Sequence, residues 1–291
     1  QSTTAQLIVN PSPSITSQPL VTQTICLNGT SQDLTVTYVN GVGEPTYQWF
    51  ENDTCAITGG TAISLNGNAS SYTPLTTLPG TKYYYVELTF PQGGCGVIPS
   101  ECAEVVIIPD PVATIDTSLS HTICDGGQIP DITVSYTGGV GNPTYQWHES
   151  TDGGTSFSPT GTDAPTYNPG TLSGEGNYQY YVEITFNDNP DNGCDLATSE
   201  TVIIQVIPEP ELTPLLATQT VCKDSPATTL EVIASGGVAP YSYQWYDDDG
   251  LILGEGGPTY TPLTDEVGTF NYYVIVQGEG SGCETQSTTA Q

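Results

Sequence analysis

Positively charged side chains are nearly absent from this chain. Lys82 and Lys223 stand against 32 acidic residues, there is no arginine, and the formal net charge is −30. Binding to nucleic acid or to an anionic membrane surface requires clustered lysine and arginine. The composition therefore argues against both functions, and it predicts an exposed, soluble surface that attracts divalent cations.

Methionine and long apolar runs are also missing. No stretch approaches the roughly 18–20 apolar residues of a membrane span, and the sequence opens with neither a methionine nor a signal segment. We therefore expect no membrane insertion in this segment, which has the character of an internal piece of a longer protein. Eight cysteines and three Asn-x-Ser/Thr triplets, at Asn28, Asn52 and Asn68, favour an oxidising, extracellular location.

A three-residue phrase shows that the chain is built from repeats. The sequence YQW occurs at 47–49, 145–147 and 243–245, at intervals of 98 residues, and a fixed period of this kind marks a repeat architecture. Each repeat ends in an apolar residue and a Pro-x-Pro phrase, which stiffens the joint because proline fixes φ. The predicted repeats are residues 10–109, 110–208 and 209–291, preceded by residues 1–9 as the final strand of an earlier repeat.

Within each repeat, apolar and polar residues alternate with a period of two, and no helical stripe of useful length occurs. About seven short strands per repeat, with turn signals every ~8–12 positions, predict an all-β sandwich of two sheets. The predicted core contains the YQW tryptophans and one valine from a later alternating strand of each repeat: Trp49, Trp147, Trp245, Val86, Val182 and Val274.

The two ends of the chain carry the same hexapeptide. Residues 1–6 and 286–291 both read QSTTAQ, a period of 285 residues, and residues 1–11 align with 99–109 and 198–208. The third repeat stops where its own final strand begins, which would leave an unpaired edge and an open core. We therefore expect a segment of a longer chain of near-identical 285-residue blocks, in which the next block completes the third repeat. The alternatives are a boundary that overlaps by chance and subunits that donate a strand to each other.

The segment GEPTYQW at 43–49 and its equivalents are accompanied by Gly-Cys pairs at 94–95, 193–194 and 282–283. This order of features resembles the immunoglobulin-like or PKD-like repeats of giant cell-surface adhesins of Bacteroidetes, including those of gliding motility. The resemblance covers all three repeats. It implies three tandem immunoglobulin-like antiparallel β-sandwiches in an elongated array, and export by the type IX secretion system.

The cysteines recur in register, one early and one late in each repeat. We therefore pair them within repeats, as Cys26 with Cys95, Cys124 with Cys194, and Cys222 with Cys283. Cys55 and Cys102 remain as a fourth bond by elimination. The alternative is that both are free thiols, and the four cysteines of the first repeat allow three pairings.

Few residues in the sequence are candidates for a catalytic role. The chain has two histidines, His121 and His148, and the sister repeats carry glutamine or an aromatic residue at their positions. No nucleophile elbow, phosphate-binding loop or Cys-x-x-Cys pair occurs. We therefore expect no enzyme and assign no catalytic residue.

Calcium is the one cofactor that the sequence suggests. Asp188, Asp191 and Asp195 crowd one loop, and hard oxygen ligands suit Ca²⁺, which extracellular modules bind with constants of about 10⁻⁴–10⁻³ M. The equivalent loop of the first repeat, 91–94, has no carboxylate. The alternative is therefore a solvated acidic turn.

These observations predict a structural segment of an extracellular cell-surface adhesin or filament, in which disulfide-closed repeats form a stalk or fibre. The expected partners are further copies of the same repeat block in one long chain or fibre, together with a surface glycan or protein ligand. The alternative is a glycan-binding or protein-binding module of a secreted protein.

Overall fold

The computed structural model describes residues 4–92, 95–186, 193–194, 196–215 and 218–291. Regular structure there consists of β-strands and one 3-10 turn, η1 (Thr117–Leu119). By its contacts the chain divides into two compact units: Gln1–Val112 with Tyr136–Thr144 and Ile184–Ala197, and Ala113–Ser135 with Tyr145–Glu183 and Thr198–Gln291. The division runs through the second repeat, whose glycine-rich turn and Gly-Cys loop belong to the unit of the first repeat.

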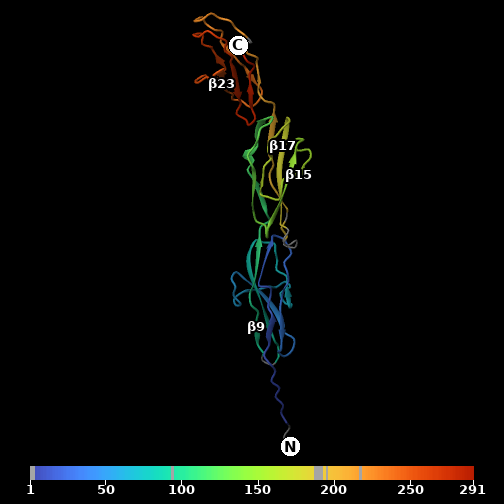
Figure 1. Ribbon diagram of the computed structural model, residues 1–291. Helices are drawn as coiled ribbons and strands as arrows, with labels where there is room; N and C mark the ends of the chain where they lie inside the picture. The colour runs from blue at the N-terminus through green and yellow to red at the C-terminus, as the bar shows by residue number, and fades with distance from the viewer. Residues whose placement is uncertain (1–3, 93–94, 187–192, 195, 216–217) are drawn as a thin grey trace. The chain divides into compact units, whose positions relative to one another are not determined.

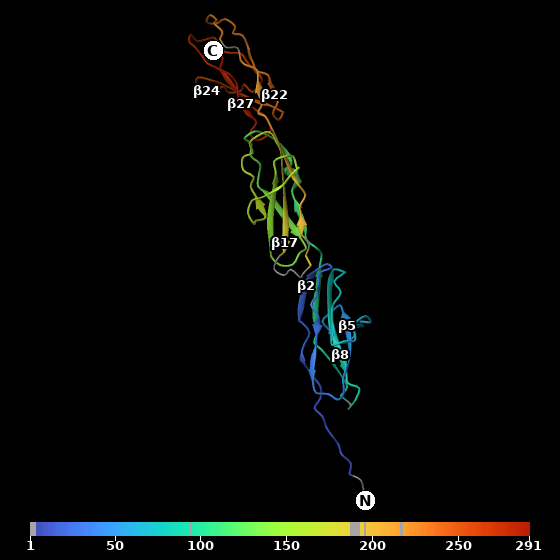
Figure 2. The ribbon, with the colours of Figure 1, turned by 90° about the vertical axis from the view of Figure 1, so that its right-hand side faces the viewer.

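The first repeat folds as two layers over one core. Its strands are β1 (Ser14–Ser17), β2 (Thr22–Cys26), β3 (Leu34–Thr35), β4 (Thr37–Val39), β5 (Thr46–Asn52), β6 (Thr61–Ala62), β7 (Ser71–Tyr72), β8 (Gly80–Thr89), β9 (Val97–Pro99) and β10 (Ala103–Ile108). The larger sheet has the order β2-β10-β8-β5-β6, with β9 beside β8, and the other layer consists of the pairs β1-β4 and β3-β7 (Figure 2). β10 pairs parallel with β2 and antiparallel with β8, so it lies inside the sheet.

The second repeat has the same strand order. Its strands are β11 (Val112–Ile115), β12 (His121–Cys124), β13 (Ile132–Thr137), β14 (Pro143–Ser150), β15 (Ser158–Thr160), β16 (Thr166–Tyr167), β17 (Gly176–Phe186), β18 (Ala197–Thr198) and β19 (Val202–Ile207). The sheets are β12-β19-β17-β14-β15, with β18 beside β17, and β11-β13-β16 (Figure 1). β19 corresponds to β10, because it is parallel to β12 and antiparallel to β17.

The third repeat has a smaller set of strands. They are β20 (Glu211–Leu212), β21 (Leu230–Glu231), β22 (Ala234–Ser235), β23 (Ser242–Asp247), β24 (Gly250–Leu251), β25 (Thr259–Tyr260), β26 (Tyr273–Gln277) and β27 (Glu284–Gln286). They form the sheet β24-β23-β26-β27 and the pairs β20-β22 and β21-β25. Within residues 218–291, the structure contains no strand in the place of β10 or β19.

The three YQW tryptophans and the valines Val86, Val182 and Val274 are all fully buried. Each tryptophan also satisfies its indole N–H, which donates 2.9 Å to a backbone oxygen of Ala69, Ala164 or Gly257. The backbone N–H of each core valine donates to a buried serine hydroxyl at 3.0 Å. The pairs are Val86 with Ser100, Val182 with Ser199, and Val274 with Ser287. Two packed layers of mainly antiparallel strands over such a core are immunoglobulin-like, as the sequence predicted.

Candidate functional site

Two disulfides join successive repeats and are the most distinctive sites in the molecule. Cys26, at the end of β2 in the first repeat, is bonded to Cys194 in the Gly-Cys loop of the second, with 5.0 Å between their Cα atoms. Cys124, at the end of β12, is bonded in the same way to Cys283 of the third repeat, with 4.9 Å between Cα atoms. The early cysteines of the first and second repeats therefore pair with the late cysteine of the following repeat.

The predicted pairs within one repeat, Cys26 with Cys95, Cys124 with Cys194 and Cys222 with Cys283, are wrong. Strand direction gives the reason. Cys26 is in register with Ile108, whose neighbour Ile107 faces Gly80 at the start of β8, whereas Cys95 follows the end of the same strand. A ten-residue strand spans roughly 30 Å, and a disulfide requires Cα atoms within about 7 Å. The two cysteines of one repeat lie at opposite ends of its sandwich.

Close backbone approach at both joints explains the glycine before each late cysteine. A Cβ added to Gly193 would overlap Gly29, and one added to Gly282 would lie 2.6 Å from the nitrogen of Gly127. Both Gly193 and Gly282 also have positive φ values, 73° and 76°. Only glycine fits both the conformation and the space.

Hydrogen bonds complete the second joint. The N–H of Cys124 donates to the carbonyl of Ser281 at 3.0 Å, and the N–H of Gln128 donates to the hydroxyl of Ser281 at 2.9 Å. Ser281, Gly29 and Gly127 were not among the predicted site residues. The glycine at the third position after Cys26 and Cys124 was the signal that could have indicated a close approach there.

Cys222 in the third repeat begins the same kind of turn as Cys26 and Cys124. The N–H of Ser225 donates to the carbonyl of Cys222 at 3.1 Å, as Gly29 does to Cys26 and Gly127 to Cys124 at 3.0 Å. Asp224 has a φ of 64°, matching 62° at Asn28. Cys222 itself is an exposed free thiol. The turn therefore has the geometry of the turns at the two paired joints, but Cys222 has no disulfide partner among the residues that the structure describes.

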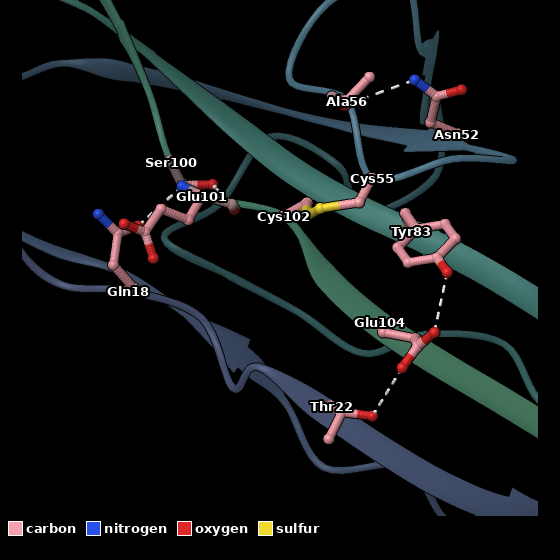
Figure 3. Close-up of a disulfide and its surroundings, with 10 residues drawn as sticks. All are labelled: Gln18, Thr22, Asn52, Cys55, Ala56, Tyr83, Ser100, Glu101, Cys102 and Glu104. Carbon is pink, nitrogen blue, oxygen red and sulfur yellow. Dashed lines mark hydrogen bonds between the residues drawn. A yellow bond between two sulfur atoms is a disulfide. The ribbon is translucent and has the colours of Figure 1, made fainter.

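The pairing of Cys55 with Cys102 is the one predicted by elimination, with 5.6 Å between Cα atoms. Figure 3 shows its surroundings on the first repeat. Beside it, the hydroxyls of Tyr83 and Thr22 both donate to the carboxylate of Glu104, at 2.9 and 3.2 Å, and so connect β8, β10 and β2. This bond closes one repeat onto itself and differs in kind from the two bonds that join repeats.

Charged side chains do not gather into a reactive centre in the part of the chain that the structure describes. No group of three or more His, Cys, Asp or Glu side chains is placed to hold a metal there, and the predicted calcium ligands Asp188, Asp191 and Asp195 lie outside it. The Lys82 ammonium lies 2.6 Å from the Asp53 carboxylate, and this hydrogen bond and charge raise the pKa of Lys82. His148 stacks on Tyr181 at 4.7 Å and lies 3.2 Å from Glu183.

An aromatic pair recurs on the YQW strand and its neighbour in every repeat. Phe50 stacks on Tyr85, His148 on Tyr181, and Tyr246 on Tyr273, with ring centroids 4.7–5.0 Å apart and planes within 9° of parallel. Phe50 and Tyr85 lie directly opposite each other on β5 and β8, as do Tyr246 and Tyr273 on β23 and β26, so these pairs are cross-strand contacts. His148 occupies the equivalent position in the second repeat, where its ring stacks on Tyr181.

Comparison with known proteins supports the repeat type. A family model for the SprB repeat matches residues 217–250, and a model for a domain of unknown function (DUF8696) matches residues 113–208. Among curated proteins, none matches the chain. No helix among the described residues is both long enough and apolar enough to cross a membrane.

Solved structures with similar folds include three multi-domain fragments. The N-terminal eight Ig domains of Down syndrome cell adhesion molecule share 16% identity at a TM-score of 0.43, covering 98% of this chain and 36% of that chain. A fragment of mouse cadherin-23 shares 13% identity at a TM-score of 0.36, covering 96% of each chain. A three-domain fragment of titin shares 12% at 0.36, covering 96% of this chain and 97% of that one. The chain thus spans about a third of the first fragment, and the likenesses concern the fold alone.

Proposed function

We propose that this chain is a structural, non-enzymatic segment of an extracellular cell-surface stalk or filament, of the kind found in the giant adhesins of Bacteroidetes. The observation that carries the proposal is the pair of staggered disulfides, Cys26 to Cys194 and Cys124 to Cys283. Each joint between repeats is thereby crossed by two covalent connections, the polypeptide and a disulfide. Two connections resist bending and twisting more than one, which suits a part that transmits force.

Composition and family resemblance support the same role. Disulfides persist in oxidising compartments, so the molecule belongs outside the cytosol, and the net charge of −30 keeps neighbouring fibres apart. The SprB repeat match supports a place among the gliding-motility adhesins. The proposed export route is type IX secretion.

The proposed partners are further copies of the same repeat block. Cys222 begins the same kind of turn as the two paired early cysteines, and its thiol is exposed. In the fibre, Cys222 would bond to the Gly-Cys loop of the repeat that follows, so that the pattern of joints continues.

Stretching single molecules tests the mechanical role. With all three disulfides intact, the shortest covalent path from end to end runs through residues 1–55, 102–124 and 283–291, which is about 30% of the chain, so an oxidised molecule should extend to about 30% of the ~1000 Å reached after reduction. A Cys124→Ser, Cys283→Ser variant should extend further than the parent, because its shortest path runs through residues 1–26 and 194–291. A Cys26→Ser, Cys194→Ser variant is the control, because that bond is not on the shortest path of the parent. Equal extension before and after reduction would contradict the proposal.

Labelling of intact cells tests the location. Antibodies raised against the chain should decorate fibres on the outside of unpermeabilised cells of the source organism. Labelling that requires permeabilisation would count against a surface stalk.

A glycan-binding or protein-binding module is the second candidate, and the recurring aromatic pair on one sheet face favours it. Aromatic faces stack on sugars and pack against protein partners. A glycan array and a pull-down with the whole chain would separate the two functions. Saturable capture that is lost in a Tyr181→Ala, Tyr273→Ala variant would favour binding over a stalk.

A further inference from the structure

The third repeat differs from its sisters around one missing strand. In the first repeat, β10 pairs with residues 22–26 on one side and 80–84 on the other. The equivalent segments of the third repeat, 218–222 and 268–272, contain no strand, although Tyr272 forms an isolated bridge to Ala290. Accordingly β26 has five residues where β8 has ten. Neither segment becomes a strand without a partner between them.

A cavity lies where that partner would be. It has a volume of about 290 Å³ and is lined on one side by residues 218–223 and on the other by residues 266–270. Leu230 and Tyr272, which belong to the core of the third repeat, also line it. The opening therefore leads to the apolar interior of the sandwich.

Ala290 and Gln291 enter this cavity in the same register as the corresponding residues of the first repeat. Ala290 and Tyr272 exchange two backbone hydrogen bonds of 2.9 Å, and the N–H of Gln219 donates to the carbonyl of Gln291 at 2.8 Å. In the first repeat the same places are held by Ala103, opposite Tyr84, and by Glu104. Two positions of the strand are thus filled, and the next four are the ones that correspond to residues 105–108.

The repeat period identifies what fits those four positions. Since residues 1–6 equal residues 286–291, Leu7, Ile8, Val9 and Asn10 follow in the sequence at the missing places. Leu7 and Val9 would then replace Val105 and Ile107, which are 1% and 6% exposed.

In the structure these apolar residues have no such environment. Leu7, Ile8 and Val9 are 88%, 69% and 82% exposed, and their segment forms no strand. Figures 1 and 2 both show it leading away from the sandwich of the first repeat. Three adjacent exposed apolar side chains are typical of a segment that docks on another surface.

We propose that the cavity of the third repeat is an acceptor site for the Leu7–Asn10 segment of a further copy of this chain. The segment enters beside Gln291, runs parallel to residues 219–222 and antiparallel to residues 268–270, and buries Leu7 and Val9. The inference rests on strand pairing and would stand without an adhesive function.

Extending the chain tests the acceptor site. One variant carries LIVNPSP, a copy of residues 7–13, directly after Gln291. Its matched control carries DIDNPSP, in which the two inward side chains are aspartate. The unextended chain gives the baseline, and the readout is amide hydrogen exchange at residues 218–222 and 268–272. Burial of a leucine and a valine should slow exchange there by about 100-fold or more relative to the control.

The free peptide LIVNPSP, added to the unextended chain, should give the same local protection in a saturable manner, and DIDNPSP should give none. Equal exchange with both extensions would overturn the proposal, as would protection that appears with either peptide. Such a failure would leave the stretching result untouched, so it can be distinguished from failure of the proposed stalk.

Discussion

The first and third repeats show what a central strand does for this fold. Residues 80–84, GTKYY, and residues 268–272, GTFNY, are close in sequence, yet the first segment is the beginning of a ten-residue strand and the second contains no strand. The difference lies in the partner, because β10 supplies backbone groups on both of its edges in the first repeat. Strand structure at this place is therefore set by pairing more than by local sequence.

The largest effect should come from making the first repeat resemble the third. Changing Val105 and Ile107 together to aspartate would place two charges at buried positions of β10. We expect a loss of about 5 kcal/mol or more in the free energy of unfolding of the first repeat. Trp49 fluorescence during urea unfolding measures it, in a background with Trp147→Phe and Trp245→Phe.

Val106→Asp is the control for this prediction, because Val106 is only half-buried on the other face of β10. An unchanged unfolding midpoint in the double variant would show that β10 is not essential to the sandwich. That outcome would remove the basis of the comparison.

The next effect concerns the joints. A Cys124→Ser, Cys283→Ser variant loses a bond that closes 159 residues, worth roughly 5 kcal/mol on the loop-entropy model and less where the native state is strained. Denaturant unfolding of oxidised protein measures the loss. Cys222→Ser is the matched control and should change nothing, since its thiol is exposed and unbonded.

Peptide mapping without reductant gives an independent check on the same bonds. Fragments containing Cys124 should remain linked to fragments containing Cys283. Recovery of Cys124 linked to Cys194 would instead support the prediction that cysteines pair within one repeat.

A smaller effect is expected from the glycine of the second joint. Gly282→Ala places a Cβ 2.6 Å from the nitrogen of Gly127 at a φ of 76°, and we expect a cost of about 2–3 kcal/mol. Gly254→Ala is the control, because Gly254 also has a positive φ but nothing within 4 Å. Its cost should be about 1 kcal/mol. Equal costs would show that close approach at the joint is unimportant.

The smallest effect is a pH dependence that compares the first two repeats, which contain the central strand β10 or β19, with the third repeat, which has no equivalent strand. Burial raises the pKa of Tyr84, Tyr180 and Tyr272, equivalent residues in the three repeats, and does so most strongly at Tyr84 and Tyr180. A pKa raised in the folded state gives stability that is complete below the unfolded value of about 10 and is lost as pH rises towards the folded value.

We therefore expect a rise in pH above about 10 to lower the free energy of unfolding of the second repeat more than that of the third. Urea unfolding followed by Trp147 and by Trp245 fluorescence on either side of that pH measures the two losses, and Tyr180→Phe should remove more of the loss in the second repeat than Tyr272→Phe removes in the third. Equal losses in the two repeats would contradict the difference in burial between the two tyrosines.

Local sequence determined a large part of this molecule. A period of two in the apolar residues is enough to define strands with one buried face, so the all-β fold and the core positions of Trp49, Trp147 and Trp245 could be predicted. The hexapeptide repeated at residues 1–6 and 286–291 indicated which strand is missing from the third repeat. Patterns of this kind need no knowledge of how distant segments meet.

Tertiary structure alone decided which cysteines meet. Early and late cysteines recur in register, and that register is equally consistent with bonds within a repeat and bonds to the next one. The direction of β8 places Cys26 and Cys95 at opposite ends of a sandwich, and the Gly-Cys loop of the next repeat brings Cys194 to Cys26 instead. Sulfur atoms bond only where the backbone brings them together, and spacing along the chain does not specify that position.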